Sequence, residues 1–251
     1  MQALEILEEI KRKRELKKIN DDLIKKLIEK NENYKKFLKQ RKKIFRKKVI
    51  KEIRATLRKI LTPMPNIFYK KYNYFLENID TEIERILNMN LSFKERKSYY
   101  GWLIEEIKKI NPKKIFDIGC GLTLLAFYYF NYKPKEYIGY DIDGYIVDLL
   151  NKFIEIKGIK GKVFCDFNFD FFSNKDDLIL ALKVLDGIEK IEKGKTREII
   201  TQKGKKIVSF SLRSWSGKKG IGQRVWFEKM LIRENIKFKK IIKENEVFYF
   251  F

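Results

Sequence analysis

Acidic residues and glycines follow three successive apolar runs of the chain. Asp117-Ile118-Gly119-Cys120-Gly121 comes directly after the first run and opens a helical pattern. The second run ends at Tyr140-Asp141-Ile142-Asp143 and the third at Cys165-Asp166-Phe167. Glycines allow a tight turn and a close approach of the backbone to a ligand. A carboxylate at the next strand end can accept both ribose hydroxyls of an adenosine, so the pattern predicts an adenosine-containing ligand.

These motifs favour S-adenosyl-L-methionine over NAD as the ligand. The Asp-x-Gly-x-Gly turn lacks the third glycine of a dinucleotide fold, and no cradle for a pyrophosphate is evident. We expect Asp141, with Ile142 beside it, to bind the ribose. Asp166 is expected to bind the adenine amino group and Phe167 to face the adenine ring. Either motif alone can arise by chance, but three in order at successive strand ends indicate one cofactor site.

An alternation of short strands and helices must position these residues. We predict strands at Lys114–Ile118, Glu136–Asp141, Lys162–Cys165, Asp177–Leu182, Lys205–Leu212, Lys237–Lys243 and Glu246–Phe250. Helices are predicted at Leu122–Phe130 and Gly144–Ile156, near 184–202 and at about 222–235. This order predicts an α/β fold with a mostly parallel sheet covered by helices on both faces. It resembles the Rossmann-like sheet of class I methyltransferases, in which the last strand is antiparallel.

Residues 1–90 are predicted to form an all-helical basic domain, and residues 91–251 the cofactor-binding domain. The chain carries a formal charge of +23, and residues 1–60 hold 22 Lys or Arg against 9 Asp or Glu. Apolar residues recur there at spacings of three and four, which indicates helices with an apolar stripe and a cationic face. Such a face favours a polyanion. A lysine-rich bias of the source organism is the alternative explanation for this charge.

The predicted partner of this face is structured RNA. The expected RNA contacts are Lys11, Arg12, Arg41, Lys42 and Lys43. Thr62-Pro63-Met64-Pro65-Asn66 interrupts the helical pattern, which resumes at about 67–78 and 80–88. Ser92-Phe93-Lys94-Glu95 has the form of a capping box and predicts a helix that runs to about Lys109.

Composition excludes several kinds of chemistry. The chain has no His and only two Cys, Cys120 and Cys165, without metal-ligand spacing, so neither a metal site nor a His-activated nucleophile is expected. No apolar run approaches the roughly 18–20 residues of a membrane span, and the N-terminus lacks a signal-peptide pattern. We expect a cytoplasmic protein that does not contact membranes and is a monomer.

Four motifs resemble those of the aminoglycoside-resistance 16S rRNA (guanine-N7) methyltransferases. Ser92–Arg96 resembles the S-x-x-E-R element of that family, and Asp117–Ala126 its D-[IL]-G-C-G-x-x-P-L-A block, with Leu124 in place of Pro. Tyr140–Asp143 matches its D-I-D step. Ser209–Lys218 resembles its S-F-P-x-[KR]-S-L-x-G-[RK] block, with departures that include Trp215. The resemblance covers about residues 88–251.

The resemblance implies roles for residues beyond the three acidic motifs. Arg96 would pair with the methionine carboxylate of the cofactor, and the Asp117, Gly119 and Gly121 turn would line it. Lys183, at the end of the fourth predicted strand, would lie beside the methyl group. The RNA target would contact Arg213, Ser214 and Lys218. Lys183 and Arg213 are the candidate catalytic residues.

The reaction is narrowed by motifs that the sequence lacks. It has no Asn/Asp-Pro-Pro-aromatic turn, which is typical of transfer to exocyclic amines, and no Pro-Cys pair for transfer to pyrimidine C5. Guanine N7 already carries an available lone pair, so alignment alone is sufficient there. We therefore expect methylation of guanine N7 in 16S rRNA on the 30S particle. A 2′-O transfer assisted by Lys183, a different RNA target, a small-molecule or protein methyltransferase, and a non-catalytic RNA-binding module stay open as alternatives.

Overall fold

Seven strands form one sheet at the centre of the protein. The structure is a computed structural model that describes residues 2–61, 64–169, 171–212 and 224–251. The strands are β1 (Ile115–Ile118), β2 (Tyr137–Asp141), β3 (Gly161–Cys165), β4 (Leu178–Leu182), β5 (Lys205–Ser211), β6 (Lys239–Lys243) and β7 (Glu246–Phe250). Each lies within two residues of the strand predicted from the apolar runs. The predicted α/β class is confirmed.

The parallel strands place their carboxyl ends, which the acidic motifs follow, at one edge of the sheet. The sheet has the order β3-β2-β1-β4-β5-β7-β6. Strands β1 to β5 pair in parallel, and β7 is antiparallel to both β5 and β6. The carboxyl ends of the five parallel strands therefore share one edge of the sheet. Since β7 runs in the opposite direction, it begins at that edge, where Glu246 pairs with Ser211.

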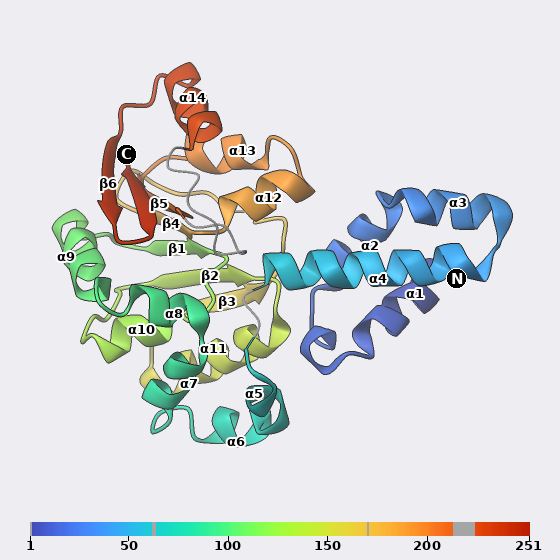
Figure 1. The fold of residues 1–251 in the computed structure, drawn as a ribbon. Helices are drawn as coiled ribbons and strands as arrows, with labels where there is room; N and C mark the ends of the chain where they lie inside the picture. The colour runs from blue at the N-terminus through green and yellow to red at the C-terminus, as the bar shows by residue number, and fades with distance from the viewer. Residues whose placement is uncertain (1, 62–63, 170, 213–223) are drawn as a thin grey trace.

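Helices cover both faces of the sheet, as predicted. One face carries α9 (Tyr100–Ile110), α10 (Thr123–Tyr129) and α11 (Gly144–Lys157). The other carries α12 (Leu185–Ile191), α13 (Lys195–Thr201) and α14 (Val225–Arg233). Figure 1 shows α12 to α14 on the side of the sheet opposite α10 and α11. Side chains alternate between faces along each strand. In β4, accordingly, Leu178 and Leu180 join the first apolar cluster, while Ile179 and Ala181 join the second.

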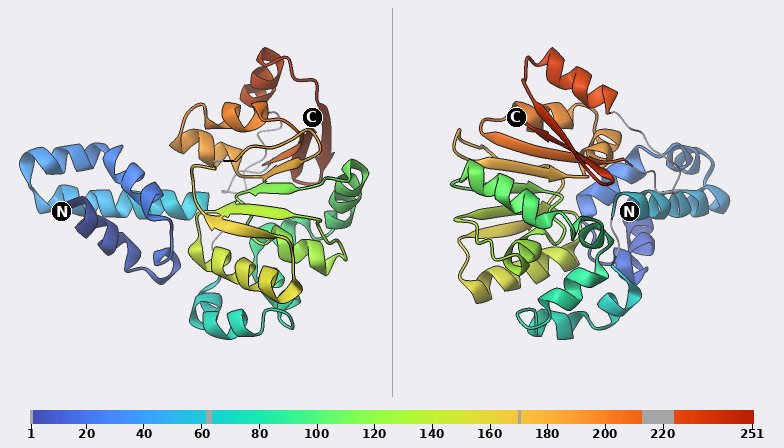
Figure 2. Two further views of the ribbon diagram at one scale, coloured as in Figure 1. Left: turned by 180° about the vertical axis from the view of Figure 1, so that it is seen from behind. Right: turned by 60° about the vertical axis from the view of Figure 1, so that its left-hand side comes forward.

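The N-terminal helices form an arm that extends from the edge where the parallel strands end. The arm, defined as residues 2–61, contains α1 (Gln2–Lys11), the short 3-10 helix η1 (Arg14–Leu16), α2 (Asp21–Glu29), α3 (Glu32–Gln40) and α4 (Lys43–Ile60). Figures 1 and 2 show α3 and α4 projecting away from the sheet. At about 1.5 Å per residue, the 18-residue helix α4 is roughly 27 Å long. Its apolar residues Val49, Ile50, Ile53 and Leu57 are buried, in a cluster that includes residues of the arm and of one face of the sheet.

Residues 64–96 pack on the sheet rather than within the arm. They form α5 (Asn66–Lys70), α6 (Tyr72–Glu77), α7 (Ile83–Met89) and α8 (Leu91–Arg96). Phe68, Phe75 and Leu87 are fully buried in the same cluster as α10 and α11. The predicted domain division at residue 90 stays a prediction. Among the described residues, no helix combines the length and apolar character needed to cross a membrane.

The helix predicted from Ser92 to about Lys109 is wrong in two respects. The chain forms two helices there, α8 and α9, because the helical bonding is interrupted between Arg96 and Tyr100. The residue that caps α8 is Asn90, whose side chain accepts a hydrogen bond from the backbone N–H of Phe93 (2.9 Å). Ser92 is the second residue of α8, within its first turn. Its hydroxyl accepts from the guanidinium of Arg96 (3.1 Å).

The assignment of the cap to Asn90 predicts the effect of substituting it. Asn90→Ala removes the acceptor from a buried helix start and should lower the free energy of unfolding by about 1 kcal/mol. Asn90→Asp retains an oxygen in the same place and should keep most of that stability. Urea unfolding followed by circular dichroism measures both. Equal stability of the alanine variant and the unmodified protein would contradict the assignment.

Candidate functional site

The glycine turn after β1 contacts the end of β2 through a carboxylate. Gly119 and Gly121 have φ of +62° and +48°, which glycine adopts without strain. The N–H of Gly121 donates to Oδ2 of Asp141 (2.8 Å). A Cβ at Gly121 would meet open space, whereas one at Gly119 would lie 2.5 Å from Cγ2 of Val184. Gly119 is thus required by packing, and Gly121 leaves room for a ligand.

Asp141 is the centre of the hydrogen bonds at this edge. Its Oδ1 accepts from the N–H of Asp143 (2.9 Å), and its carbonyl accepts from the N–H of Asp166 (3.1 Å). Burial raises the pKa of Asp141, although the bonds from Asp143 and Gly121 oppose the rise. A carboxylate has about four lone-pair sites. The structure therefore places the two predicted adenosine-binding acids side by side and leaves acceptor capacity on Asp141.

Asp117 is buried beneath the glycine turn with one unsatisfied oxygen. Its side chain is 1% exposed, and the hydroxyl of Tyr137 donates to Oδ2 (2.7 Å). Among the described residues, no group forms a hydrogen bond with Oδ1. Burial raises the pKa of Asp117 to about 7, against the effect of the bond from Tyr137. A buried acceptor without a partner is costly, so Oδ1 is suited to a cationic or hydrogen-bonding ligand.

A cluster of charged side chains lies at the ends of β4 and β5. The Glu246 cluster comprises Glu95, Arg96, Tyr99, Lys183, Ser209 and Glu246. The side chain of Glu246 is fully buried, and both of its oxygens accept from Nε of Arg96 (3.1 and 2.9 Å). Burial alone would raise the pKa of Glu246. The charges of Arg96 and Lys183, together with hydrogen bonds from Arg96 and Ser209, outweigh this effect and lower it.

The structure brings the two predicted site cations, Arg96 and Lys183, onto this one carboxylate. Nζ of Lys183 lies 3.0 Å from Oε2 of Glu246 and 2.8 Å from Oε2 of Glu95. Lys183 has a φ of +62°, an uncommon conformation for a residue with a side chain. Among the described residues, Arg96 uses Nε and Nη2 for Glu246 and Nη1 for Ser92. Nη1 thus retains a hydrogen for another acceptor.

The other predicted cofactor residues are Ile142 and Phe167. Ile142 is partly buried and joins Asp141 to Asp143. The side chain of Phe167 is 4% exposed and packs in the apolar cluster shared with the arm. The ammonium of Lys26, on α2, lies 5.5 Å from the centre of the Phe167 ring. Phe167 is thereby fixed by the arm as well as by the sheet.

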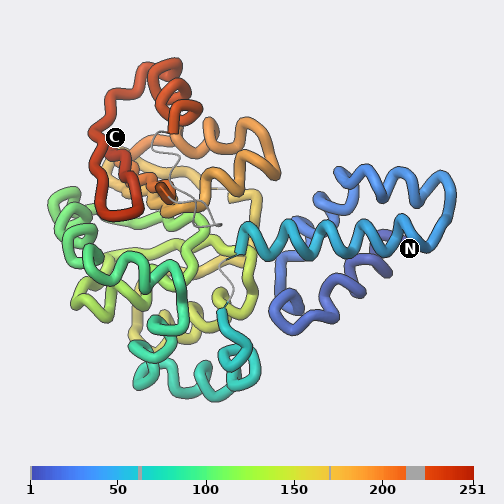
Figure 3. Tube along the Cα trace, in the orientation of Figure 1, coloured from blue at the N-terminus to red at the C-terminus, as the bar shows by residue number. Residues whose placement is uncertain are grey.

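The predicted RNA-binding residues of the arm differ in their freedom to bind a partner. Arg41, Lys42 and Lys43 are exposed in the turn between α3 and α4, at the end of the arm away from the sheet (Figure 3). Arg12 is also exposed. Lys11 instead donates to the carbonyl of Ile19 (3.0 Å) and pairs with Asp21. These internal contacts occupy its ammonium.

A concave surface of the arm is lined mostly by basic residues. It has a volume of about 380 Å³ and is lined by Glu9, Lys13, Lys47, Ile50, Lys51, Arg54 and Arg58. Arg54 donates to backbone carbonyls of α1, and Arg58 pairs with Glu15. Two of its lysines, Lys13 and Lys47, belong to the basic runs Lys11–Arg14 and Arg46–Lys48 of the sequence, whereas Lys51 lies outside them. The helical periodicity does not show which basic residues of different helices face one another.

The RNA contacts that the resemblance implies after β5 cannot be located in the structure. Arg213, Ser214 and Lys218 lie outside the described residues.

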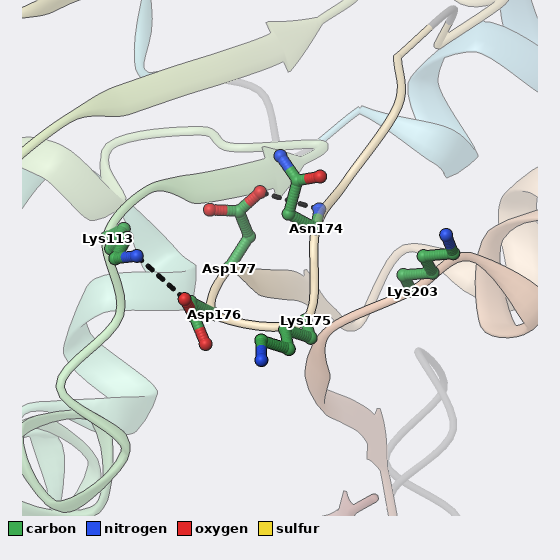
Figure 4. Close-up of a pocket in the computed structure, with 6 residues that line it drawn as sticks. All are labelled: Lys113, Asn174, Lys175, Asp176, Asp177 and Lys203. Carbon is green, nitrogen blue, oxygen red and sulfur yellow. Dashed lines mark hydrogen bonds and ion pairs between the residues drawn. The ribbon is translucent and has the colours of Figure 1, made fainter.

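The larger cavity of the protein, about 620 Å³, is shown in Figure 4 and is lined by Lys113, Asn174, Lys175, Asp176, Asp177 and Lys203. These residues precede β1, β4 and β5, so they lie at the edge where the parallel strands begin. Neither this cavity nor the basic one is lined by a predicted cofactor residue.

Sequence reasoning missed Glu246 and Tyr137. Glu246 stands at the start of an apolar strand. Only the antiparallel pairing of β7 with β5 brings it to the edge of the sheet where the parallel strands end (the cofactor edge). A single acidic residue opening an otherwise apolar run is the one signal that marks it. Tyr137 reads as an ordinary core aromatic, and its bond to Asp117 depends on the parallel register of β1 and β2.

Together, the order and directions of the strands define the Rossmann-like fold of class I methyltransferases. The family model described as "Ribosomal RNA methyltransferase (FmrO)" matches residues 76–233, which is more than half of the chain. The protein therefore belongs to this family of rRNA methyltransferases. No curated protein sequence matches it.

Solved structures with the same fold extend over nearly the whole chain. The 16S rRNA methyltransferase RmtF in complex with S-adenosyl-L-homocysteine has a TM-score of 0.78 at 18% identity, covering 99% of this chain and 96% of its own. The 16S rRNA methylase RmtB has a TM-score of 0.73 at 21% identity, covering 99% and 97%. An rRNA methylase from Escherichia coli has a TM-score of 0.72 at 18% identity, covering 99% and 98%. At these identities the likeness concerns the fold, and here it includes the arm.

The raised pKa of Asp117 predicts a dependence of stability on pH in the absence of cofactor. The unfolded chain protonates this carboxyl only below about pH 4, whereas the folded protein does so up to about pH 7. Between these values the folded state binds more protons, so the contribution of Asp117 to stability falls as pH rises. The free energy of unfolding of the unmodified protein, minus that of Asp117→Asn, should therefore decrease from pH 4.5 to 7 and level off above it. Urea titrations at several pH values measure this difference, and a flat profile would refute the shift.

Proposed function

We propose that the protein methylates N7 of a guanine in 16S rRNA within the 30S particle, acting as a cytoplasmic monomer. Membership of the rRNA methyltransferase family supports an RNA substrate. The relatives RmtF and RmtB, which share the fold of both the sheet and the arm, are 16S rRNA methyltransferases. The observation that carries the choice of atom is the pairing of Lys183 and Arg96 with Glu246 beside the proposed site of transfer.

The residues at the strand ends fit S-adenosylmethionine. Within the part of the chain that the structure describes, Gly121 leaves open space beside the backbone and Asp117 has a buried oxygen without a partner. We assign the ribose to Asp141 and the adenine to Asp166, which the structure places together. We assign the ammonium group of the methionine to Asp117 and its carboxylate to Nη1 of Arg96. When bound, the cofactor supplies an electrophilic methyl group on a sulfonium.

The charged groups beside this site favour methyl transfer to an atom that carries no proton. Nζ of Lys183 donates to two carboxylates, so Lys183 is arranged as a donor rather than as a proton acceptor. Transfer to a ribose hydroxyl requires a group that takes its proton. Guanine N7 offers a lone pair without losing a proton, so the protein needs to align the acceptor and exclude water.

The arm supplies contacts to the RNA phosphates in this proposal. Arg12 and the turn Arg41–Lys43 are exposed, and the basic surface of α4 adds Lys47 and Lys51. Phosphate contacts fix the orientation of a protein on RNA without reading its sequence. A rigid arm joined to the cofactor edge would therefore select a folded RNA surface by its shape.

Mapping the modified nucleotide tests the proposed target. The protein is incubated with labelled S-adenosylmethionine and, separately, 30S particles, naked 16S rRNA, 50S particles and tRNA. We expect label in the 30S particle, and mass spectrometry of nuclease fragments should locate it on one guanine. Reduction followed by aniline cleaves RNA at N7-methylguanine and identifies the atom. Label on a ribose, on another base or mainly in tRNA would refute the proposal.

Charge reversal at the tip of the arm should separate RNA binding from cofactor binding. Arg41→Glu, Lys42→Glu and Lys43→Glu together remove up to three phosphate contacts, each worth about 0.7–0.9 in the slope of log K against log salt. We expect that slope to fall by about 2–3 and 30S binding to weaken. The affinity for S-adenosylhomocysteine, measured by calorimetry, should stay unchanged.

A matched control carries the same change of charge elsewhere. Lys133, Lys135 and Lys175 are exposed in the loops that precede β2 and β4, at the opposite edge of the sheet. Reversal of these three should leave the salt slope nearly unchanged. An equal loss of RNA binding in both triple variants would show that only net charge matters, and a loss of cofactor binding in the arm variant would contradict the separation.

A further inference from the structure

A short segment of the arm pairs with the loop that follows β2. We call this segment, Lys18–Asn20, the strap; it connects η1 to α2. The N–H of Gly144 donates to the carbonyl of Lys18 (2.9 Å), and the N–H of Asn20 donates to the carbonyl of Ile142 (2.9 Å). An antiparallel bridge lies between these two bonds. The strap is thus joined to the end of β2 as a short strand would be.

The side chain of Asn20 makes a second connection, to the end of β3. Its Nδ2 donates to the carbonyl of Cys165 (2.9 Å), and its Oδ1 accepts from the N–H of Leu23 (2.8 Å). The second bond caps the start of α2. One residue of the arm therefore binds the ends of two neighbouring strands through two hydrogen bonds, one from its main-chain nitrogen and one from its side-chain nitrogen.

The two carbonyls that Asn20 binds adjoin the acids at the cofactor edge. Ile142 follows Asp141, and Cys165 precedes Asp166. We propose that Asn20 is a positioning residue for the cofactor site, which holds the ends of β2 and β3 in the arrangement that adenosine binding requires. This inference rests on the proposed placement of S-adenosylmethionine against Asp141 and Asp166.

The strap is held tightly on both sides. A Cβ at Gly144 would lie 2.6 Å from the carbonyl oxygen of Lys18, closer than real Cβ atoms approach. The ammonium of Lys18 donates to Asp148 on α11 (2.6 Å), and that of Lys11 donates to the carbonyl of Ile19 (3.0 Å). The strap is therefore linked to α1 and to α11 as well as to the end of β2. These links are what allow Asn20 to fix the loops.

Substitution of Asn20 tests the proposal through cofactor affinity. Asn20→Asp keeps the oxygen that caps α2 but replaces the Nδ2 donor with an oxygen that faces the carbonyl of Cys165. We expect the Kd for S-adenosylhomocysteine, measured by calorimetry without RNA, to rise about ten-fold, which corresponds to about 1.4 kcal/mol. In methylation assays the KM for S-adenosylmethionine should rise while kcat at saturation is retained, a split that a general loss of folded protein would not produce.

Asn31→Asp is the matched control. Asn31 caps α3 in the same arm, accepting from the N–H groups of Asn33 and Tyr34, and its Nδ2 donates to Glu52. The substitution changes the same cap chemistry and the same charge, but no bond to β2 or β3 is involved. Its Kd for S-adenosylhomocysteine should equal that of the unmodified protein.

A second variant moves the strap without changing Asn20. Gly144→Ala places a methyl group against the carbonyl of Lys18 and should also weaken binding of S-adenosylhomocysteine. Gly101→Ala is its control, because Gly101 also lies in the first turn of a helix. Among the described residues, no atom outside its chain neighbours and the backbone of its own helix lies within 4 Å of its Cβ position. This control should bind normally.

The outcomes separate this inference from the proposed cofactor site. Normal binding by Asn20→Asp and Gly144→Ala, with loss of binding by Asp141→Ala, would overturn the role of Asn20 and leave the cofactor placement intact. Normal binding by both Asp141→Ala and Asp166→Ala would overturn the placement, and the inference with it. Thermal unfolding of each variant shows that folded protein is compared, and Gly144→Ala decides the matter where Asn20→Asp fails to fold.

Discussion

The ion pair between Arg96 and the fully buried Glu246 is the interaction on which the cofactor edge of the sheet depends. A buried carboxylate is stable only when charges and hydrogen bonds replace its lost solvation. Arg96 from α8, Lys183 from the end of β4 and Ser209 from β5 supply them. Removing one partner of such a pair commonly costs about 3–5 kcal/mol. The positions of Arg96 and Lys183 are therefore set by the fold before any cofactor binds.

The strands and their acidic ends could be predicted because short apolar runs bounded by glycine and aspartate are local signals. Parallel pairing then brings Asp117, Asp141 and Asp166 to one edge without further information. The start of α8 could not be predicted in the same way. Asn90 and Ser92 are both good caps, and Glu95 completes a capping box in the sequence. In the structure the carboxylate of Glu95 binds Lys183 instead, so a tertiary contact overrides the local pattern.

The net charge of the arm predicted a polyanion-binding surface but not which cations are available for it. Long lysine side chains reach several ångströms and satisfy nearby carbonyls and carboxylates. Lys11, Lys26 and Lys30 are used in this way within the protein. The cationic side chains of the turn between α3 and α4 stay exposed, because this turn lies at the end of the arm away from the sheet. Only the packing of helices distinguishes these two groups of lysines.

The apolar interior of the arm is continuous with that of the sheet. Leu57 and Leu61 belong to the same buried cluster as Leu185 and Ile188 on α12, and a Cβ on Gly187 would touch Ile60. A shortened chain beginning after residue 61 would present this apolar surface to water and would tend to aggregate. The arm is consequently not an exchangeable module. Grafting it onto another methyltransferase would succeed only if the matching surface of α12 were transferred with it.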